Sequence, residues 1–191
     1  VEGNALTAVN FAGAKHHAMA EHSSGFCVFS DHALVAIYLL KNSDDVHRIA
    51  IIDFDAHHGD GTEVLLCDEP RALTFSIHDS TIFPGTGHDD DPEKGIFNRP
   101  LASGSGDGEL LAGIADFDRA AREFNPDLIF VAMGADGHIT DPLSTLTYSI
   151  EGMTAAITEL RAAFPHTPFL LGGAGGYQPD SITPQVWAAM A

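Results

Sequence analysis

Residues 48–55 read RIAIIDFD, an apolar run that ends on two acidic residues. A strand of a parallel sheet is covered on both faces, so its sequence is almost continuously apolar instead of alternating. The same character is found at residues 72–78 (ALTFSIH), 127–133 (DLIFVAM) and 168–171 (PFLL). We therefore expect four buried strands at these places.

Amphipathic stretches separate the apolar runs. Apolar residues recur every three or four positions within residues 31–40, 109–124 and 150–164, which predicts three helices. Strands that alternate with helices indicate βαβ units, and hence an α/β fold with a mostly parallel sheet. Residues 82–107 are rich in Gly, Pro and Asp and are expected to form a long loop. The length suits one domain, residues 1–191.

The charge of the chain is strongly unbalanced. Lysine and arginine number 9 against 27 aspartates and glutamates, which gives a formal net charge of -18. A chain this acidic repels polyanions, so we expect no direct binding to nucleic acid or to an anionic membrane. It attracts cationic ligands such as a basic peptide or a polyamine, although the charge alone would also serve solubility.

The sequence also bears on location. It contains no apolar run of the ~18 residues that a membrane helix needs, and Val1–Asn4 show no sign of an export signal. Two cysteines do not make a disulfide framework. We expect a cytoplasmic protein, and the sequence gives no indication of its oligomeric state.

Acids and imidazoles follow the predicted strands. Asp53, Asp55 and His57 close the first strand, and Asp136 follows the third. Alternate residues of an extended segment share a face, so these side chains are expected to converge at the carboxyl edge of the sheet, where α/β proteins bind ligands. Carboxylates and an imidazole without cysteine suit zinc or another first-row divalent metal. The alternative is a cluster of helix caps or ion pairs.

Two further features carry polar chemistry. His16 and His17 are adjacent, and Asp53 and Asp60 could each orient one imidazole for acid–base work, although adjacent histidines are more often plain surface residues. The glycine cluster that follows the fourth strand ends on Tyr177, whose hydroxyl could donate to an oxyanion. A tight turn with a packed tyrosine fits that cluster equally well.

Six motifs follow one another along the chain. They are His16-His17-Ala18, Gly25-Phe26-Cys27, DFDAHHGDG at 53–61, Phe83-Pro84-Gly85-Thr86-Gly87, Gly134-Ala135-Asp136 and Gly175-Gly176-Tyr177. The set resembles the motifs of histone deacetylases and their bacterial relatives, the acetoin-utilisation proteins and acetylpolyamine amidohydrolases. This resemblance implies an arginase/deacetylase-like three-layer α/β fold with a mostly parallel sheet and the active site at the carboxyl ends of the strands. Because the family's catalytic domain is longer, we expect residues 1–191 to form part of one.

The resemblance also implies roles for individual residues. The implied zinc ligands are Asp55, His57 and Asp136. The implied catalytic residues are His16 and His17, with His17 as general base and acid, their partners Asp53 and Asp60, and Tyr177, which would polarise the amide carbonyl. The implied channel for the acyl-lysine stem is lined by Gly25, Phe26, Phe83 and Leu143. A structural potassium ion would be held by Asp53, Asp55, His57, Ser76 and the main chain of Ile77.

The implied activity is zinc-dependent hydrolysis of N-acetyl-lysine in proteins, or of a small acetylated amine, to the free amine and acetate. Leu143 favours an acyl-lysine, since polyamine specialists of the family can place an acid there, while the acidic composition leaves polyamines open. One departure is Lys15, at a position where relatives usually have Trp or Gly. The alternatives are an acetylpolyamine deacetylase, a non-catalytic zinc-bound fragment and, with least support from the ligand set, a two-manganese ureohydrolase.

Overall fold

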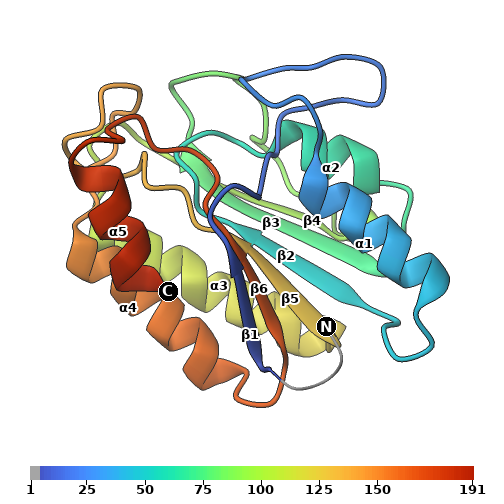
Figure 1. Ribbon diagram of the computed structural model, residues 1–191. Helices are drawn as coiled ribbons and strands as arrows, with labels where there is room; N and C mark the ends of the chain where they lie inside the picture. Colours follow the sequence, from blue (N-terminus) through green and yellow to red (C-terminus); the bar gives the residue numbers. More distant parts are fainter. Residues whose placement is uncertain (1–4) are drawn as a thin grey trace.

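The computed structural model describes residues 5–191 and contains a six-stranded sheet in which every pair of neighbouring strands is parallel (Figure 1). Val1–Asn4, which were expected to belong to the domain and to carry no export signal, lie outside the described residues. The strand order is β1-β6-β5-β2-β3-β4. The elements are β1 (Thr7–Asn10), α1 (Asp31–Asn42), β2 (Ile49–Asp53), α2 (Asp60–Leu66), β3 (Ala72–Asp79), the 3-10 turn η1 (Pro92–Lys94), β4 (Ile96–Leu101), α3 (Asp107–Phe124), β5 (Leu128–Ala132), α4 (Ile150–Ala163), β6 (Phe169–Gly172) and α5 (Ile182–Met190).

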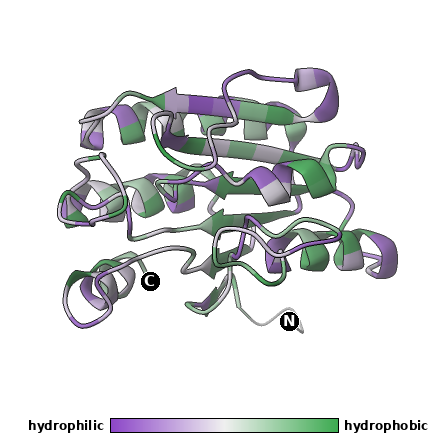
Figure 2. Cartoon of the chain, turned by 90° about the horizontal axis from the view of Figure 1, so that it is seen from above, coloured by the Kyte–Doolittle hydropathy of each residue, from purple (hydrophilic) through white to green (hydrophobic). Residues whose placement is uncertain are grey.

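Helices cover both faces of the sheet, so the fold has three layers. On β2, Ile49 and Ile51 pack in one apolar cluster with α1 and α2, whereas Ala50 and Ile52 pack in the other with α3, α4 and α5. Figure 2 shows the largely hydrophobic strands between the two layers of helices. The expected α/β architecture is confirmed, and the continuous apolar character of residues 48–55 follows from this burial on both faces.

The register of the central strands brings distant polar segments together. Asp53, the last residue of β2, pairs with Ser76 of β3 on one side and with Ala132 of β5 on the other. Parallel strands end at the same edge of a sheet, so the segments that follow β2, β3, β5 and β6 meet there. In Figure 1 the loops after these strands gather at the upper end of the sheet.

Part of the predicted secondary structure was wrong. The expected loop at 82–107 contains η1 and β4, and the helix after it begins at Asp107. β4 was missed because Asn98 and Arg99 interrupt the apolar character of its sequence, IFNRPL. It also contains Pro100, which is tolerated because β4 is an edge strand. The short elements β1, α2 and α5 were also missed. The first predicted strand ends at Asp53, so Asp55 lies in the turn beyond it.

The length and hydropathy of the helices bear on whether the described chain crosses a membrane. None of those within residues 5–191 combines the length and the apolar character that crossing a bilayer requires.

Candidate active site

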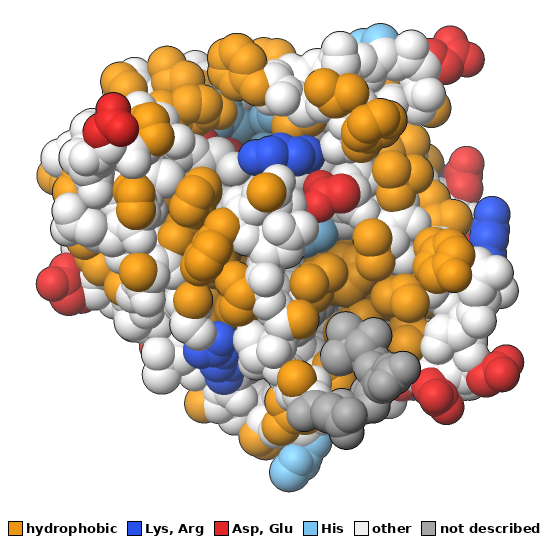
Figure 3. Space-filling view, viewed as in Figure 1, with side chains coloured by type: hydrophobic (Ala, Val, Ile, Leu, Met, Phe, Trp, Pro, Cys, Tyr) orange, Lys and Arg blue, Asp and Glu red, His pale blue; other side chains and the backbone are white. Residues whose placement is uncertain are grey.

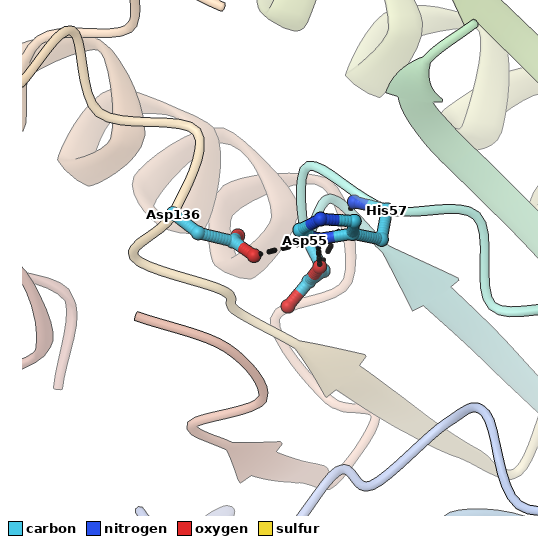
Figure 4. Close-up of side chains that lie close together, drawn as sticks. All are labelled: Asp55, His57 and Asp136. Carbon is cyan, nitrogen blue, oxygen red and sulfur yellow. Dashed lines mark hydrogen bonds and ion pairs between the residues drawn. The ribbon is translucent and has the colours of Figure 1, made fainter. Parts of the chain in front are cut away.

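Three buried side chains from two strand ends form a compact set of ligand atoms. His57 Nδ1 lies 2.9 Å from Asp136 Oδ2 and 3.2 Å from Asp55 Oδ1, and the three groups offer ligand atoms within 4.8 Å of one another (Figure 4). Asp55 and Asp136 are 0% exposed and His57 is 7% exposed. Two carboxylates and one imidazole, with no sulfur, match the donors of a first-row divalent metal with open coordination positions. The structure thus brings the predicted ligands together.

The electrostatics of this set indicate that a cation would be stabilised among the three groups. Burial opposes protonation of His57, but its contacts with Asp136 and Asp55 outweigh that effect and raise its pKa to about 10. Burial and the neighbouring Asp55 raise the pKa of Asp136 to about 7. The carboxylates thus face each other in a poorly solvated space, where a divalent ion would relieve their repulsion.

Main-chain groups orient the two carboxylates. Ala56 N donates to Asp136 Oδ1 at 2.9 Å, and Gly175 N donates to Asp55 Oδ2 at 2.6 Å. This close approach requires glycine, because a Cβ atom at Gly175 would lie 2.5 Å from Asp136 Oδ2. The glycine segment after β6, residues 173–177, therefore forms one wall of the candidate metal site.

The histidine pair lies beside this set, and each ring contacts one of the two carboxylates expected to orient the pair. His16 Nδ1 is 2.6 Å from Asp53 Oδ2, and His17 Nδ1 is 2.7 Å from Asp60 Oδ1. All four side chains are buried. Asp60 begins α2 and so lies beyond the strand whose end carries Asp53. A carboxylate that accepts from Nδ1–H leaves Nε2 of each ring available to a reacting group.

The two imidazoles have different proton affinities. The pKa of His16 is raised to about 10, because the charges of Asp53 and Asp55 outweigh burial. The pKa of His17 is lowered, mainly by burial and also by the charge of His16, in spite of its bond to Asp60. Two neighbouring imidazoles whose pKa values are shifted in opposite directions suit separate acid and base roles. The lowered pKa leaves His17 as the ring that is free to accept a proton.

The predicted channel residues line one cavity of about 380 Å³ above the site. Its walls are Gly25, Phe26, Phe83, Leu143 and Ile82, and it reaches His17, His57 and Tyr177. Ile82 was missed in the sequence, although it adjoins Phe83. On the face seen in Figure 3, hydrophobic side chains gather over the loops at the carboxyl ends of the strands, and histidines are visible in the hollow among them.

Tyr177 lies beside the three candidate metal ligands. Its ring centroid is 6.2 Å from that of His57 and 6.0 Å from that of Phe26. Burial, followed by the charges of Asp55 and Asp136, raises the pKa of the phenol, so the hydroxyl keeps its proton and is a hydrogen-bond donor. Its main-chain N donates to Asp141 Oδ2 at 2.9 Å, a contact that sequence reasoning did not find.

Of the five residues of the predicted potassium site, Asp53 and Ser76 line a common cavity between β2 and β3. This small internal cavity of about 10 Å³ is the size of one water molecule or one ion. The cavity also contacts Thr74, whose hydroxyl is buried without a partner in the described chain. Ile77 is fully buried next to Ser76, while Asp55 and His57 direct their side chains to the candidate metal set.

The chain matches the family model of the histone deacetylase domain over residues 1–191. It is 34% identical to the acetoin utilization protein AcuC of Bacillus subtilis (strain 168) over 200 residues, which covers 98% of this chain and 51% of that protein. A probable deacetylase of Archaeoglobus fulgidus is 36% identical over 143 residues, covering 72% of this chain and 39% of that protein.

A solved structure has the same fold. The acetylpolyamine aminohydrolase of Burkholderia pseudomallei superposes with a TM-score of 0.84 at 25% identity, covering 98% of this chain and 57% of that one. The chain belongs to the histone deacetylase family. It spans about half the length of the AcuC relatives that it matches.

Proposed function

We propose that the protein is a zinc-dependent amidohydrolase that removes the acetyl group from N-acetyl-lysine in proteins or from a small acetylated amine. The observation that carries the proposal is the convergence of a buried three-ligand set and two His–Asp pairs at the base of an apolar cavity. Membership of the histone deacetylase family supports it.

The residues of the chain have distinct tasks in this reaction. A zinc ion held by Asp55, His57 and Asp136 would lower the pKa of a water molecule and polarise the amide carbonyl. His17, which lines the cavity, takes the proton of the attacking water at Nε2, because Asp60 occupies its Nδ1. Tyr177 donates its hydroxyl to the carbonyl oxygen as negative charge develops there.

The second half of the reaction returns the proton. The C–N bond of the amide breaks, and the protonated histidine transfers its proton to the departing nitrogen, which leaves as the free amine. The acyl carbon keeps the water oxygen and is released as acetate. His16, whose pKa Asp53 and Asp55 raise, lies beside His17 at a ring-centroid distance of 4.0 Å, so its protonated form discourages a lasting second charge on His17 and favours this transfer.

The cavity favours the methylene stem of an acetylated lysine. Phe26, Phe83 and Leu143 offer apolar surface to a methylene stem, and none of the described residues that line the cavity carries a carboxylate. A polyamine would present a second ammonium that this cavity leaves unpaired. The net charge of -18 keeps a polyamine as the second candidate, because it attracts any polycation.

We also propose that a structural potassium ion is held by Asp53, Asp55, His57, Ser76 and the main chain of Ile77, and of these residues Asp53 and Ser76 line the small cavity. A carboxylate, hydroxyl groups and a volume suited to one ion support this assignment. Removal of potassium should lower the thermal midpoint without removing zinc.

The test combines metal analysis with turnover. Purified protein is loaded with zinc, its metal content is measured, and hydrolysis of an acetyl-lysine peptide is compared with that of an acetylated diamine. We expect one zinc per chain and faster release of acetate from the peptide, and His17→Ala should keep the zinc but lose turnover. Stoichiometric zinc without turnover on either substrate would favour a non-catalytic zinc-bound domain. Two metals and release of urea from arginine would favour the ureohydrolase.

A further inference from the structure

A second cavity, of about 180 Å³, adjoins the active site and has an unusual backbone around it. It shares Tyr177, His17 and Phe26 with the channel and is otherwise lined mainly by the segment before the histidine pair and the glycine segment after β6. Three of the four non-glycine residues with positive φ in the described chain line it: Ala14 (62°), Phe26 (63°) and Ala174 (52°). Such conformations are unfavourable, so the surrounding contacts must hold them.

Lys15 provides one of these contacts. Its Nζ donates to the carbonyl oxygen of Ala174 at 3.0 Å, a bond between residues 159 positions apart. Its own main chain is held by Asp31 at the start of α1, whose carboxylate accepts from Ala14 N at 3.0 Å and from Lys15 N at 2.6 Å. The lysine is therefore fixed at its base and reaches across to the glycine segment.

The peptide group that Lys15 holds is also bound at its other end. The carbonyl of Ala174 and the N–H of Gly175 belong to one planar peptide unit. Gly175 N donates to Oδ2 of Asp55 at 2.6 Å. An ammonium at the oxygen polarises the unit and strengthens the donation from its N–H, because hydrogen bonds in series reinforce one another.

We propose that Lys15 is a positioning residue: by holding the Ala174 carbonyl, it fixes the peptide 174–175 between its ammonium and Asp55, and so sets the positions of Asp55 and Tyr177. Tyr177 lies three residues beyond Ala174 in the same segment, and the bond from its main-chain N to Asp141 fixes the far end. The meaning of these positions for catalysis rests on the proposed function. The restraint itself does not.

Trp187 offers a direct measurement of the restraint. It is the only tryptophan of the chain, its Nε1 donates to Gly173 O at 2.9 Å, and it lines the same cavity as Lys15. Its fluorescence therefore reports on the glycine segment, whether or not the protein turns over a substrate.

The experiment compares Lys15→Met, which keeps the stem without the donor, with Lys15→Arg, which keeps a donor. Lys94→Met is the matched control, because Lys94 is exposed and its ammonium forms a surface ion pair with Asp91 at 3.6 Å. In zinc-loaded protein, we expect Lys15→Met to raise the acrylamide quenching constant of Trp187 about twofold, since a segment that loses an anchor opens more often. Lys15→Arg and Lys94→Met should match the unmodified protein.

Kinetics supply the second readout. We expect Lys15→Met to lower kcat about tenfold with little change in KM, as a small misplacement of a reacting group does. In a Tyr177→Phe background the same change should lower kcat by clearly less than tenfold, because the part of its effect that acts through the Tyr177 hydroxyl is already lost. The proposal would be overturned if the fold-losses in kcat of Lys15→Met and Tyr177→Phe multiplied in full in the double variant. It would also be overturned if Trp187 quenching were unchanged in Lys15→Met. If the unmodified chain proves inactive on both substrates, the proposed function fails, and the Trp187 comparison still decides whether Lys15 restrains the segment.

Discussion

The base of the channel and its mouth are held in opposite ways. At the base, Asp55 and Asp136 are 0% exposed, and each carboxylate accepts from a main-chain N–H as well as facing His57. At the mouth, Phe26 is 85% exposed, Phe83 49% and Leu143 42%. A fully bonded polar cluster tolerates no partial replacement, whereas an exposed apolar wall acts only through its contact with a ligand. Changes at the base should therefore abolish chemistry, and changes at the mouth should adjust affinity.

The largest effect is expected from Asp136→Ala. Loss of one of three ligands leaves Asp55 and His57 unable to retain the metal, so bound zinc should disappear and kcat/KM should fall by about 10³-fold or more. Metal content and peptide hydrolysis measure this, and added zinc should no longer raise the thermal midpoint. The matched control is Asp44→Ala, at an exposed aspartate between α1 and β2. Retention of stoichiometric zinc by Asp136→Ala would remove this residue from the ligand set.

Asp60→Asn should come next. The carboxylate accepts from His17 Nδ1 at 2.7 Å, and an asparagine can instead donate to that nitrogen and select the wrong tautomer. We expect kcat to fall about 10³-fold with zinc unchanged, in the manner of other His–Asp pairs. Nitrogen NMR of the imidazoles identifies the tautomer directly, and Asp68→Asn, at a position remote from the site after α2, is the control. Full activity would show that His17 does not depend on this partner.

Tyr177→Phe should have a somewhat smaller effect. Removal of one donor to a developing oxyanion lowers kcat by about 10²-fold, with zinc content unaltered. Tyr38→Phe is a suitable control, since Tyr38 is 63% exposed on α1. A kcat equal to that of the unmodified protein would mean that the hydroxyl points away from the carbonyl oxygen.

The smallest effect is expected at the mouth, for Phe26→Ala. The side chain offers apolar surface to the methylene stem of the acetyl-lysine, so its removal should raise KM a few-fold while kcat stays constant, because one partly covered ring buries little area. The neighbouring Phe29, 69% exposed and absent from the cavity wall, provides the control in Phe29→Ala. A fall in kcat with constant KM would place Phe26 in the chemistry and remove the contrast between base and mouth.

The strands that sequence patterns located are the ones buried on both faces. Residues 48–55, 72–78, 127–133 and 168–171 all overlap observed strands, because burial on two sides demands an unbroken apolar run. The edge strands β1 and β4 have no such demand on their sequences, and both escaped prediction. Pro100 in β4 even argued for a loop, although an edge position leaves its missing N–H without consequence.

The residues of the site also fall into those that sequence motifs located and those that they did not. The ligand set and the association of the histidine pair with Asp53 and Asp60 were predicted, because these residues sit in compact sequence motifs. Which carboxylate holds which imidazole was not predicted. Asp31 and Lys15 were not assigned a contact, since one begins a helix and the other precedes the histidine pair without a pattern of its own.

By itself, the sequence determined the class of fold, the family and the set of polar residues available for the chemistry. These properties depend on consecutive residues and their spacing, which the chain carries before it folds. Only the tertiary structure decided that Asp55 and Asp136 share His57, that Ile82 joins the channel wall, and that Lys15 reaches Ala174. Those contacts join segments up to 159 residues apart, and their geometry follows from strand register and the packing of loops at one edge of the sheet.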